Sequence, residues 1–104
     1  MSVLGKRLKD ARLKSGLSQE QLGLQAGLEV ESASARMNRY ERATRVPSVE
    51  LMERIGCVLD LPLTYFYAGD EDEAALLVAF HRMPPDDRAT LLEVAVKMAD
   101  AGRA

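Results

Sequence analysis

The sequence predicts an all-α fold, with five helices in residues 1–68 followed by a helical hairpin in residues 69–104. Apolar residues recur at three- and four-residue spacing along the chain, which is typical of amphipathic helices. No stretch alternates strictly between apolar and polar residues, so no strand is predicted. Of the 104 residues, 47% are hydrophobic and 29% are charged, as expected for a globular domain with a small appendage.

The first two helices are predicted from an apolar stripe and from capping residues. The first covers residues 3–14 and ends at Gly16, which can adopt the left-handed conformation of a C-terminal cap. The second begins at Ser18, whose hydroxyl can accept a hydrogen bond from the backbone amide of Gln21, and it ends at Gly27. The apolar residues expected to face inward are Leu4, Leu8, Ala11, Leu22 and Ala26.

The third helix is predicted over residues 32–42, and its two faces differ in chemistry. Ala33, Met37 and Tyr40 share the inner face and would hold the helix on the core. A basic loop at residues 44–47 follows. The outer face and its flanks are polar or small and include three arginines: Ser32, Ser34, Ala35, Arg36, Asn38, Arg39 and Arg42.

Two further helices complete the predicted domain. Ser48 is expected to cap a fourth helix, and a short fifth helix follows residue 61. Cys57 has mostly apolar neighbours and is expected to be a small buried residue. The apolar residues expected in the core are Leu51, Ile55, Leu59, Leu63 and Phe66.

Residues 69–104, the tail, are predicted to form two helices. An acidic run at residues 70–73 favours a helix N-terminus through the helix dipole, and Pro84-Pro85 ends this helix and begins another. The hairpin either packs on its own domain or forms a dimerisation element. We prefer dimerisation, because apolar surface that a small domain cannot cover normally marks an interface. Apolar residues occupy more than one stripe: Leu76, Leu77, Phe80, Leu91, Leu92, Val94, Val96 and Met98.

Charge is divided unevenly along the chain, although the net charge is only −2. Residues 1–54 carry ten Lys or Arg against seven Asp or Glu, whereas residues 55–104 carry four against nine. This asymmetry is expected when only the first half contacts a polyanion. The lone Cys57, the lack of a secretory signal and the lack of a long apolar run lead us to expect a cytoplasmic protein without a membrane partner.

An ordered set of motifs lies between residues 3 and 67. It comprises Arg12, Gly-Leu-Ser-Gln at 16–19, Ala-Gly at 26–27, Met-Asn-Arg-Tyr-Glu at 37–41 and Pro-Ser at 47–48. Each motif is common by itself, but the set in this order resembles the phage-repressor and Cro-like helix-turn-helix regulators, the xenobiotic response element family. The resemblance covers about two-thirds of the chain.

The resemblance implies double-stranded DNA as the partner, a homodimer, and a third helix that lies in the major groove. In the family, Arg12 and Glu41 form an ion pair between the first and third helices, so neither is counted as a base reader. We expect phosphate contacts from Gln19, Arg42, Thr44 and Arg45. Contacts to base edges, with Arg39 matched to guanine, are expected from Ser34, Ala35, Arg36, Asn38 and Arg39.

Two departures from the family pattern stand out. Between Gly27 and Met37 the chain has about four more residues than usual, which either lengthen the turn or add a helical turn that enters the groove. They include Glu29 and Glu31, which are unusual beside phosphates. Ala43 stands where the family often has Gly. Because a left-handed Ala would cost ~1 kcal/mol, we expect the helix to run on.

No residue set predicts an enzyme, a metal site or a cofactor. His81 is the only histidine, and neither metal-ligand spacing nor a glycine-rich phosphate loop is present. We therefore predict a regulator, by default a repressor, that binds a palindromic operator and has no evident small-molecule effector. Two alternatives stay open: an antitoxin whose tail binds a toxin, and a protein-interaction module that has lost DNA binding.

Overall fold

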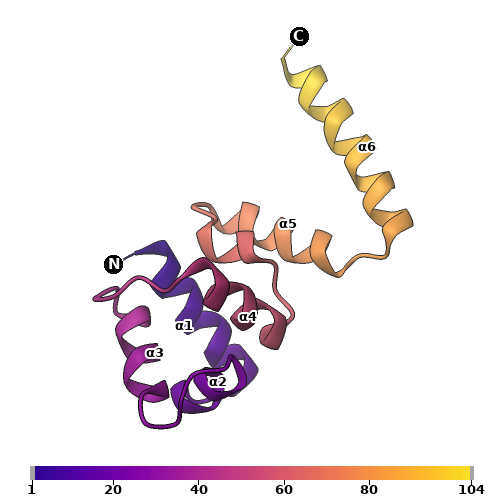
Figure 1. The fold of residues 1–104 in the computed structure, drawn as a ribbon. Helices are drawn as coiled ribbons and strands as arrows, with labels where there is room; N and C mark the ends of the chain where they lie inside the picture. Colours follow the sequence, from indigo (N-terminus) through magenta and orange to yellow (C-terminus); the bar gives the residue numbers. More distant parts are fainter. Residues whose placement is uncertain (1, 104) are drawn as a thin grey trace.

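The computed structural model describes residues 2–103, and every regular element in that range is helical (Figure 1). This confirms the all-α prediction. In chain order the elements are α1 (Val3–Ser15), α2 (Gln19–Gln25), α3 (Ala33–Glu41), α4 (Val49–Leu59), the 3-10 helix η1 (Leu63–Tyr67), α5 (Glu71–Arg82) and α6 (Pro85–Gly102).

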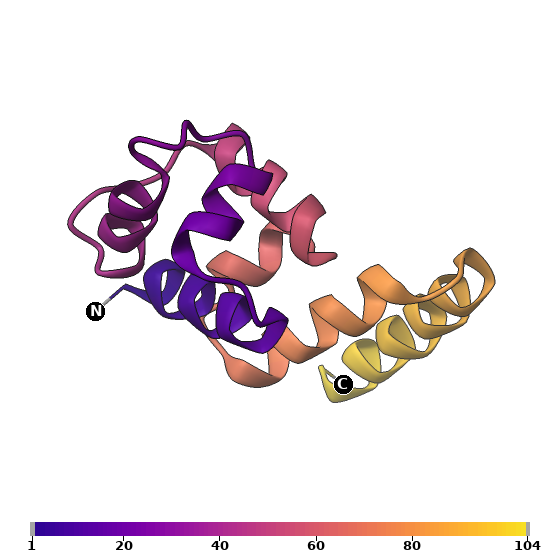
Figure 2. The same ribbon diagram turned by 90° about the horizontal axis from the view of Figure 1, so that it is seen from below.

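The first four helices and η1 enclose one hydrophobic core, and Figure 2 shows α1 crossing beneath the others. Each of these elements contributes at least one side chain that is fully or almost fully buried, as the periodicity of the sequence predicts. The largest of these side chains are Leu8, Leu22, Met37, Leu51, Met52, Ile55 and Phe66.

The helix ends follow the capping residues read from the sequence. The Ser18 hydroxyl accepts from the Gln21 backbone amide at 3.0 Å, and the Gln21 side chain accepts from the Ser18 amide at 2.8 Å. Ser48 caps α4 by accepting from the Leu51 amide at 3.1 Å. Gly16 ends α1 with a φ of 76°, which costs glycine little. Local hydrogen bonds therefore set where these helices begin and end.

A glycine allows α1 and α3 to approach each other closely. A Cβ atom placed on Gly5 would lie 2.5 Å from the backbone oxygen of Glu41. That distance is far below van der Waals contact, so a larger residue would push the two helices apart. The position of α3 relative to the core therefore depends on the absence of a side chain at residue 5.

Helix α5 is fixed to the domain by a buried arginine of α1. The Arg7 side chain is 4% exposed; its Nε donates to the Ala68 backbone oxygen at 2.9 Å and its Nη1 to the Glu71 carboxylate at 3.3 Å. Lys6 also binds Glu71 at 3.3 Å, and Ala74 on the inner face of α5 is buried. Together, Arg7 and Lys6 hold the pKa of Glu71 below its ordinary value.

The C-terminal region contains the two helices that the sequence predicts. The two tail helices and the break at Pro84 are present, but α6 is directed away from the rest of the molecule (Figure 1). None of its residues is buried, and the described chain measures 55 Å along its longest axis against 28 and 22 Å along the others. Within residues 2–103, α6 therefore does not add to the core of the domain.

Two local expectations are wrong. Helix α3 does not run on through Ala43: Arg42 is its C-cap, and Ala43 has a φ of 62° in the left-handed region. The backbone amides of Thr44 and Arg45 both point to the Arg39 carbonyl, and these bonds offset the cost of the left-handed alanine. Cys57 is exposed, because it lies on the side of α4 that faces away from the core.

Candidate nucleic-acid interface

Helix α3 is held from below by its apolar residues and presents its polar residues outward. Ala33, Met37 and Tyr40 are buried against the core. Asn38 is partly buried at the edge of the exposed face. The exposed residues on α3 and at its C-terminal cap are Ser34, Ala35, Arg36, Arg39 and Arg42. A short helix with a buried anchor and a cationic outer face is thus presented at the surface.

A buried ion pair joins α1 to the end of α3. Arg12 Nε donates to Glu41 Oε2 at 2.6 Å and Nη2 donates to Oε1 at 3.1 Å, while Nη1 reaches the Leu17 carbonyl at 3.1 Å. The hydrogen bonding that Arg12 donates to Glu41 is the main reason that the pKa of Arg12 lies above its ordinary value. Both residues are therefore scaffold, as the family resemblance implied.

Gln19 is drawn into a network with α3. Its Nε2 donates to Asn38 Oδ1 at 3.3 Å and to Glu41 Oε1 at 3.2 Å. Because the first of these bonds uses the Oδ1 acceptor of Asn38, the Nδ2 group of Asn38 remains able to donate a hydrogen bond outward. One hydrogen-bond network thus connects the start of α2, the middle of α3 and the Arg12–Glu41 pair.

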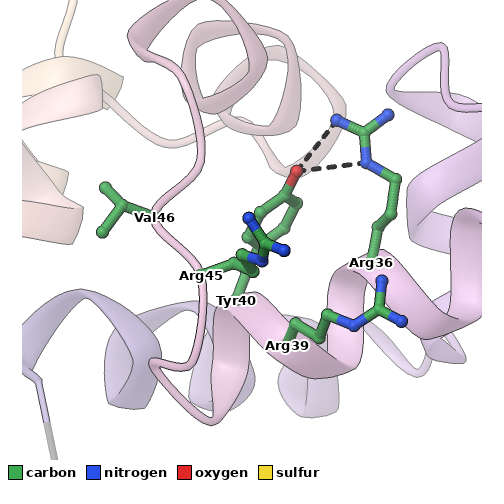
Figure 3. A pocket seen from close by; sticks show the side chains of 5 residues that line it. All are labelled: Arg36, Arg39, Tyr40, Arg45 and Val46. Atoms are coloured by element: carbon green, nitrogen blue, oxygen red, sulfur yellow. Dashed lines mark hydrogen bonds between the residues drawn. The ribbon is translucent and has the colours of Figure 1, made fainter.

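Arg36 lies against Tyr40 and is held there. Its Nε and Nη2 donate to the Tyr40 hydroxyl at 3.2 and 2.9 Å, and its guanidinium lies 5.9 Å from the ring centroid. Arg39, Arg45 and Val46 line the same shallow hollow (Figure 3). Three arginines from α3 and the following loop are therefore gathered around one buried aromatic ring.

The loop after α3 is ordered by the end of the helix. The Thr44 amide donates to the Arg39 carbonyl at 3.0 Å, and the Thr44 hydroxyl donates to the same oxygen at 3.3 Å. The left-handed Ala43 turns the chain here, and Arg42 and Arg45 on either side of the turn are exposed. Both cations border the outer face of α3.

The additional residues before α3 lengthen the turn and add nothing to the helix. The backbone amides of Ser32 and Ala33 donate to the Glu29 carbonyl at 3.1 and 2.8 Å, and α3 begins only at Ala33. Glu29 and Glu31 are exposed in this turn. The first of the two alternatives for this segment is therefore the one that the structure shows.

Sequence reasoning missed one cation beside this surface. Lys9 of α1 lines a hollow together with Gln19, Asn38 and Arg42, and its side chain is exposed. The helical periodicity of α1 marks Lys9 as outward facing. No local pattern indicates that this side of α1 lies next to α3, because that proximity depends on the close approach at Gly5.

The geometry of α2 and α3, two short helices joined by a turn with the second presenting a polar face, is that of a helix-turn-helix. A family model described as Helix-turn-helix, HTH_3, matches residues 8–66. The chain belongs to this family. No helix in residues 2–103 is long and apolar enough to cross a bilayer.

A solved structure is similar beyond the family domain. The crystal structure of the transcriptional regulator BswR shares 36% sequence identity with the chain and superposes with a TM-score of 0.83. The match covers 93% of this chain and 96% of that one, so it extends past residue 66 into the C-terminal helices. The comparison with curated proteins gave no match.

Proposed function

We propose that this helix-turn-helix protein is a DNA-binding transcriptional regulator, a repressor that binds a palindromic operator as a homodimer with one α3 in each major groove. The observation that carries the proposal is the cationic outer face of α3 and its loop, where Arg36, Arg39, Arg42 and Arg45 are exposed in a chain whose net charge is −2. The major groove admits one α-helix, and α3 is presented without a covering element.

Base reading is assigned to the outer face of α3. Arg39 projects from the middle of this face, and its planar fork matches guanine O6 and N7. Arg36 would read from a fixed position, because Tyr40 holds its guanidinium. Asn38 can donate through the amide nitrogen that Gln19 leaves available, and Ser34 and Ala35 lie toward the start of the helix, where Ala can contact a thymine methyl group.

Phosphate contacts are assigned to the margins of that face. Arg42, Thr44 and Arg45 flank the left-handed turn at Ala43, and Gln19 lies in the first turn of α2. Such contacts set the register and the affinity of the complex but carry little sequence information. Because Gln19 Nε2 already donates to Asn38 and Glu41, a phosphate contact through the Gln19 side chain would require one of these two bonds to open.

The test is selection from a randomised DNA duplex followed by binding measurements on the recovered site. We expect a palindrome whose half-sites lie about one helical turn apart. Arg39→Ala should relax the preference at one base pair per half-site by ~1–3 kcal/mol. Arg45→Ala should weaken all sequences alike and reduce the salt slope by about one. Recovery of no enriched sequence, with no binding to any duplex, would favour a protein-interaction module.

A further inference from the structure

Helix α6 carries an apolar arc that nothing in residues 2–103 covers. At about 100° per residue, Asp86, Glu93, Lys97 and Asp100 fall within roughly one third of the circumference, whereas Asp87 and Arg88 near the start of the helix lie outside that third. Met98 is 70% exposed and no residue of the helix is buried. From residue 91 onward, the remaining arc is apolar or small: Leu91, Leu92, Val94, Ala95, Val96, Met98 and Ala99.

Helix α5 has two apolar faces, of which only one is used within the described chain. Ala74 packs inward on the domain and is 2% exposed. Leu76 and Phe80, on the opposite side of the helix, are 54% and 37% exposed. The outer face of α5 and the exposed apolar arc of α6 are apolar surfaces of the kind that marks an interface.

The same chain cannot bring these two faces together in the geometry observed. Met83 and Pro84 are extended, and Arg88 in the second turn of α6 reaches back to the end of α5. Arg88 Nε donates to the Phe80 carbonyl at 2.8 Å and Nη2 donates to the His81 carbonyl, with the guanidinium 5.3 Å from the Phe80 ring centroid. These bonds satisfy carbonyls at the C-terminal end of α5 and set the direction of α6.

The end of α5 is itself fixed to the domain. The Asp60 carboxylate lies 3.2 Å from His81 Nε2 and 3.4 Å from Arg82 Nε, and Arg82 also donates to the Asp60 backbone oxygen. Arg88 therefore binds α6 to α5. Helix α5 is itself attached to the domain at both ends, by Arg7 at its N-terminus and by Asp60 at its C-terminus. The outward direction of α6 follows from these contacts (Figure 1).

We infer that a second copy of the chain covers both faces by reciprocal exchange, with α6 of each copy lying across the outer face of α5 of the other. The inference rests on the homodimer of the proposed function and assigns its interface. One two-fold contact of this kind covers two apolar faces that one chain leaves open, and self-complementary surfaces of this type are the usual basis of dimers. It also supplies packing to a helix that would be only marginally stable alone in water.

The charges of the tail argue against an anionic partner or a lipid surface as the occupant. Residues 70–103 carry eight Asp or Glu against four Lys or Arg, whereas helices that lie on membranes are rich in Lys and Arg on their polar face. The acidic tail also stays clear of DNA phosphates. An exchanged pair of α5 and α6 helices would therefore join two α3 helices without competing for the groove.

The first experiment is cross-linking between differently tagged copies in a Cys57→Ser background, which removes the exposed native thiol. One copy carries Leu76→Cys on the outer face of α5, and the other carries Leu92→Cys on the apolar arc of α6. A bismaleimide should join the two different copies, and Thr90→Cys on the polar side of α6 should cross-link at least about tenfold less. Cross-links only between two Leu92→Cys copies would show α6 pairing with α6 and overturn the exchange.

The second experiment measures dimerisation without DNA by sedimentation equilibrium. Leu92→Glu should weaken the dimer at least about tenfold, because it places a charge in the apolar contact. Thr90→Glu adds the same charge to the same helix and should leave the dimer intact. Helical content and the thermal transition of the core check that both variants fold. A wild-type chain that stays monomeric at all concentrations would contradict the inference.

These outcomes separate the interface from the proposed function. An exchanged dimer that binds no duplex would support the interface and contradict DNA binding. A chain that selects a DNA sequence while Leu92→Glu and Thr90→Glu dimerise equally well would support DNA binding and contradict the exchange.

Discussion

Helices α3 and α6 both present much of their surface to solvent, but only α3 packs one face against the core. Helix α3 has nine residues, and its inner face is pinned by Met37 and Tyr40. Helix α6 has eighteen residues and none of them is buried. The longer helix is therefore the one without tertiary support. The proposed DNA-reading surface on α3 has an opposite face that packs on the core, whereas the proposed docking surface on α6 has none.

The buried ion pair beneath α3 offers the largest test of this contrast. Arg12→Met should destabilise the core by about 3–5 kcal/mol, because it strands the Glu41 carboxylate in a buried position. Adding Glu41→Gln should recover part of the loss. The matched change in α6 is Lys97→Met, which breaks an exposed pair and should cost at most about 0.5 kcal/mol.

Denaturant unfolding of the core reports both values. Equal losses for Arg12→Met and Lys97→Met would contradict the contrast between the two helices, since they would mean that α6 is as tightly integrated as α3. A double variant as unstable as Arg12→Met alone would instead show that the stranded carboxylate is not the source of the cost.

The close approach of α1 and α3 gives the next largest effect. Gly5→Ala should destabilise by about 1–3 kcal/mol, because its Cβ would collide with the Glu41 backbone oxygen and force the helices apart. Gly102→Ala in α6 meets nothing within 4 Å and should leave core stability unchanged. Thermal unfolding followed by circular dichroism measures both. If Gly5→Ala unfolds like the parent chain, α3 is not positioned by this contact.

Substitution of Ala43, the left-handed residue after α3, should raise the stability of the core where the preceding substitutions lower it. Ala43→Gly should stabilise the core by about 0.5–1 kcal/mol, because glycine adopts a positive φ without steric cost. Ala89→Gly in the exposed part of α6 should leave core stability unchanged, since that helix makes no buried contact. Urea unfolding compares the two variants. A loss of stability in Ala43→Gly would indicate that the turn is not left-handed.

The smallest effect concerns the attachment of α5 and depends on pH. Arg7 and Lys6 lower the folded-state pKa of Glu71 below 4.5, so the pair stabilises the fold above that pH and the contribution is lost as pH falls through the lowered value. The free energy of unfolding of Glu71→Gln should therefore be lower than that of the parent chain at pH 7, and this difference should become smaller as the pH falls to 3. Parallel unfolding curves across this range would contradict the pairing.

Sequence patterns found the elements and caps because these depend on neighbouring residues. The capping box at Ser18 and the buried positions of Met37 and Tyr40 follow from spacing alone, and the Arg12–Glu41 pair follows from the family resemblance. Ala43 was misjudged because the bonds to the Arg39 carbonyl outweigh its local preference. Local patterns do not account for longer-range capping of this kind.

Contacts between residues far apart in the sequence could not be predicted from local patterns either. The bond between Gln19 and Asn38 joins α2 and α3, whose relative placement depends on the close packing of Gly23 against Ala33 and Met37. The direction of α6 depends on Arg88 capping the end of α5, which no helical periodicity encodes. Cys57 was expected to be buried from its apolar neighbours, yet in a helix the residues beside it in sequence point elsewhere.

The most direct test of the central claim is a titration of the ¹⁵N-labelled chain with random-sequence duplex DNA at low salt, where phosphate contacts alone support binding. The account predicts saturable backbone amide shifts concentrated from the start of α2 through α3 to Arg45, with α6 unchanged. Shifts that are largest in α6, or a spectrum that duplex DNA leaves unaltered, would contradict it.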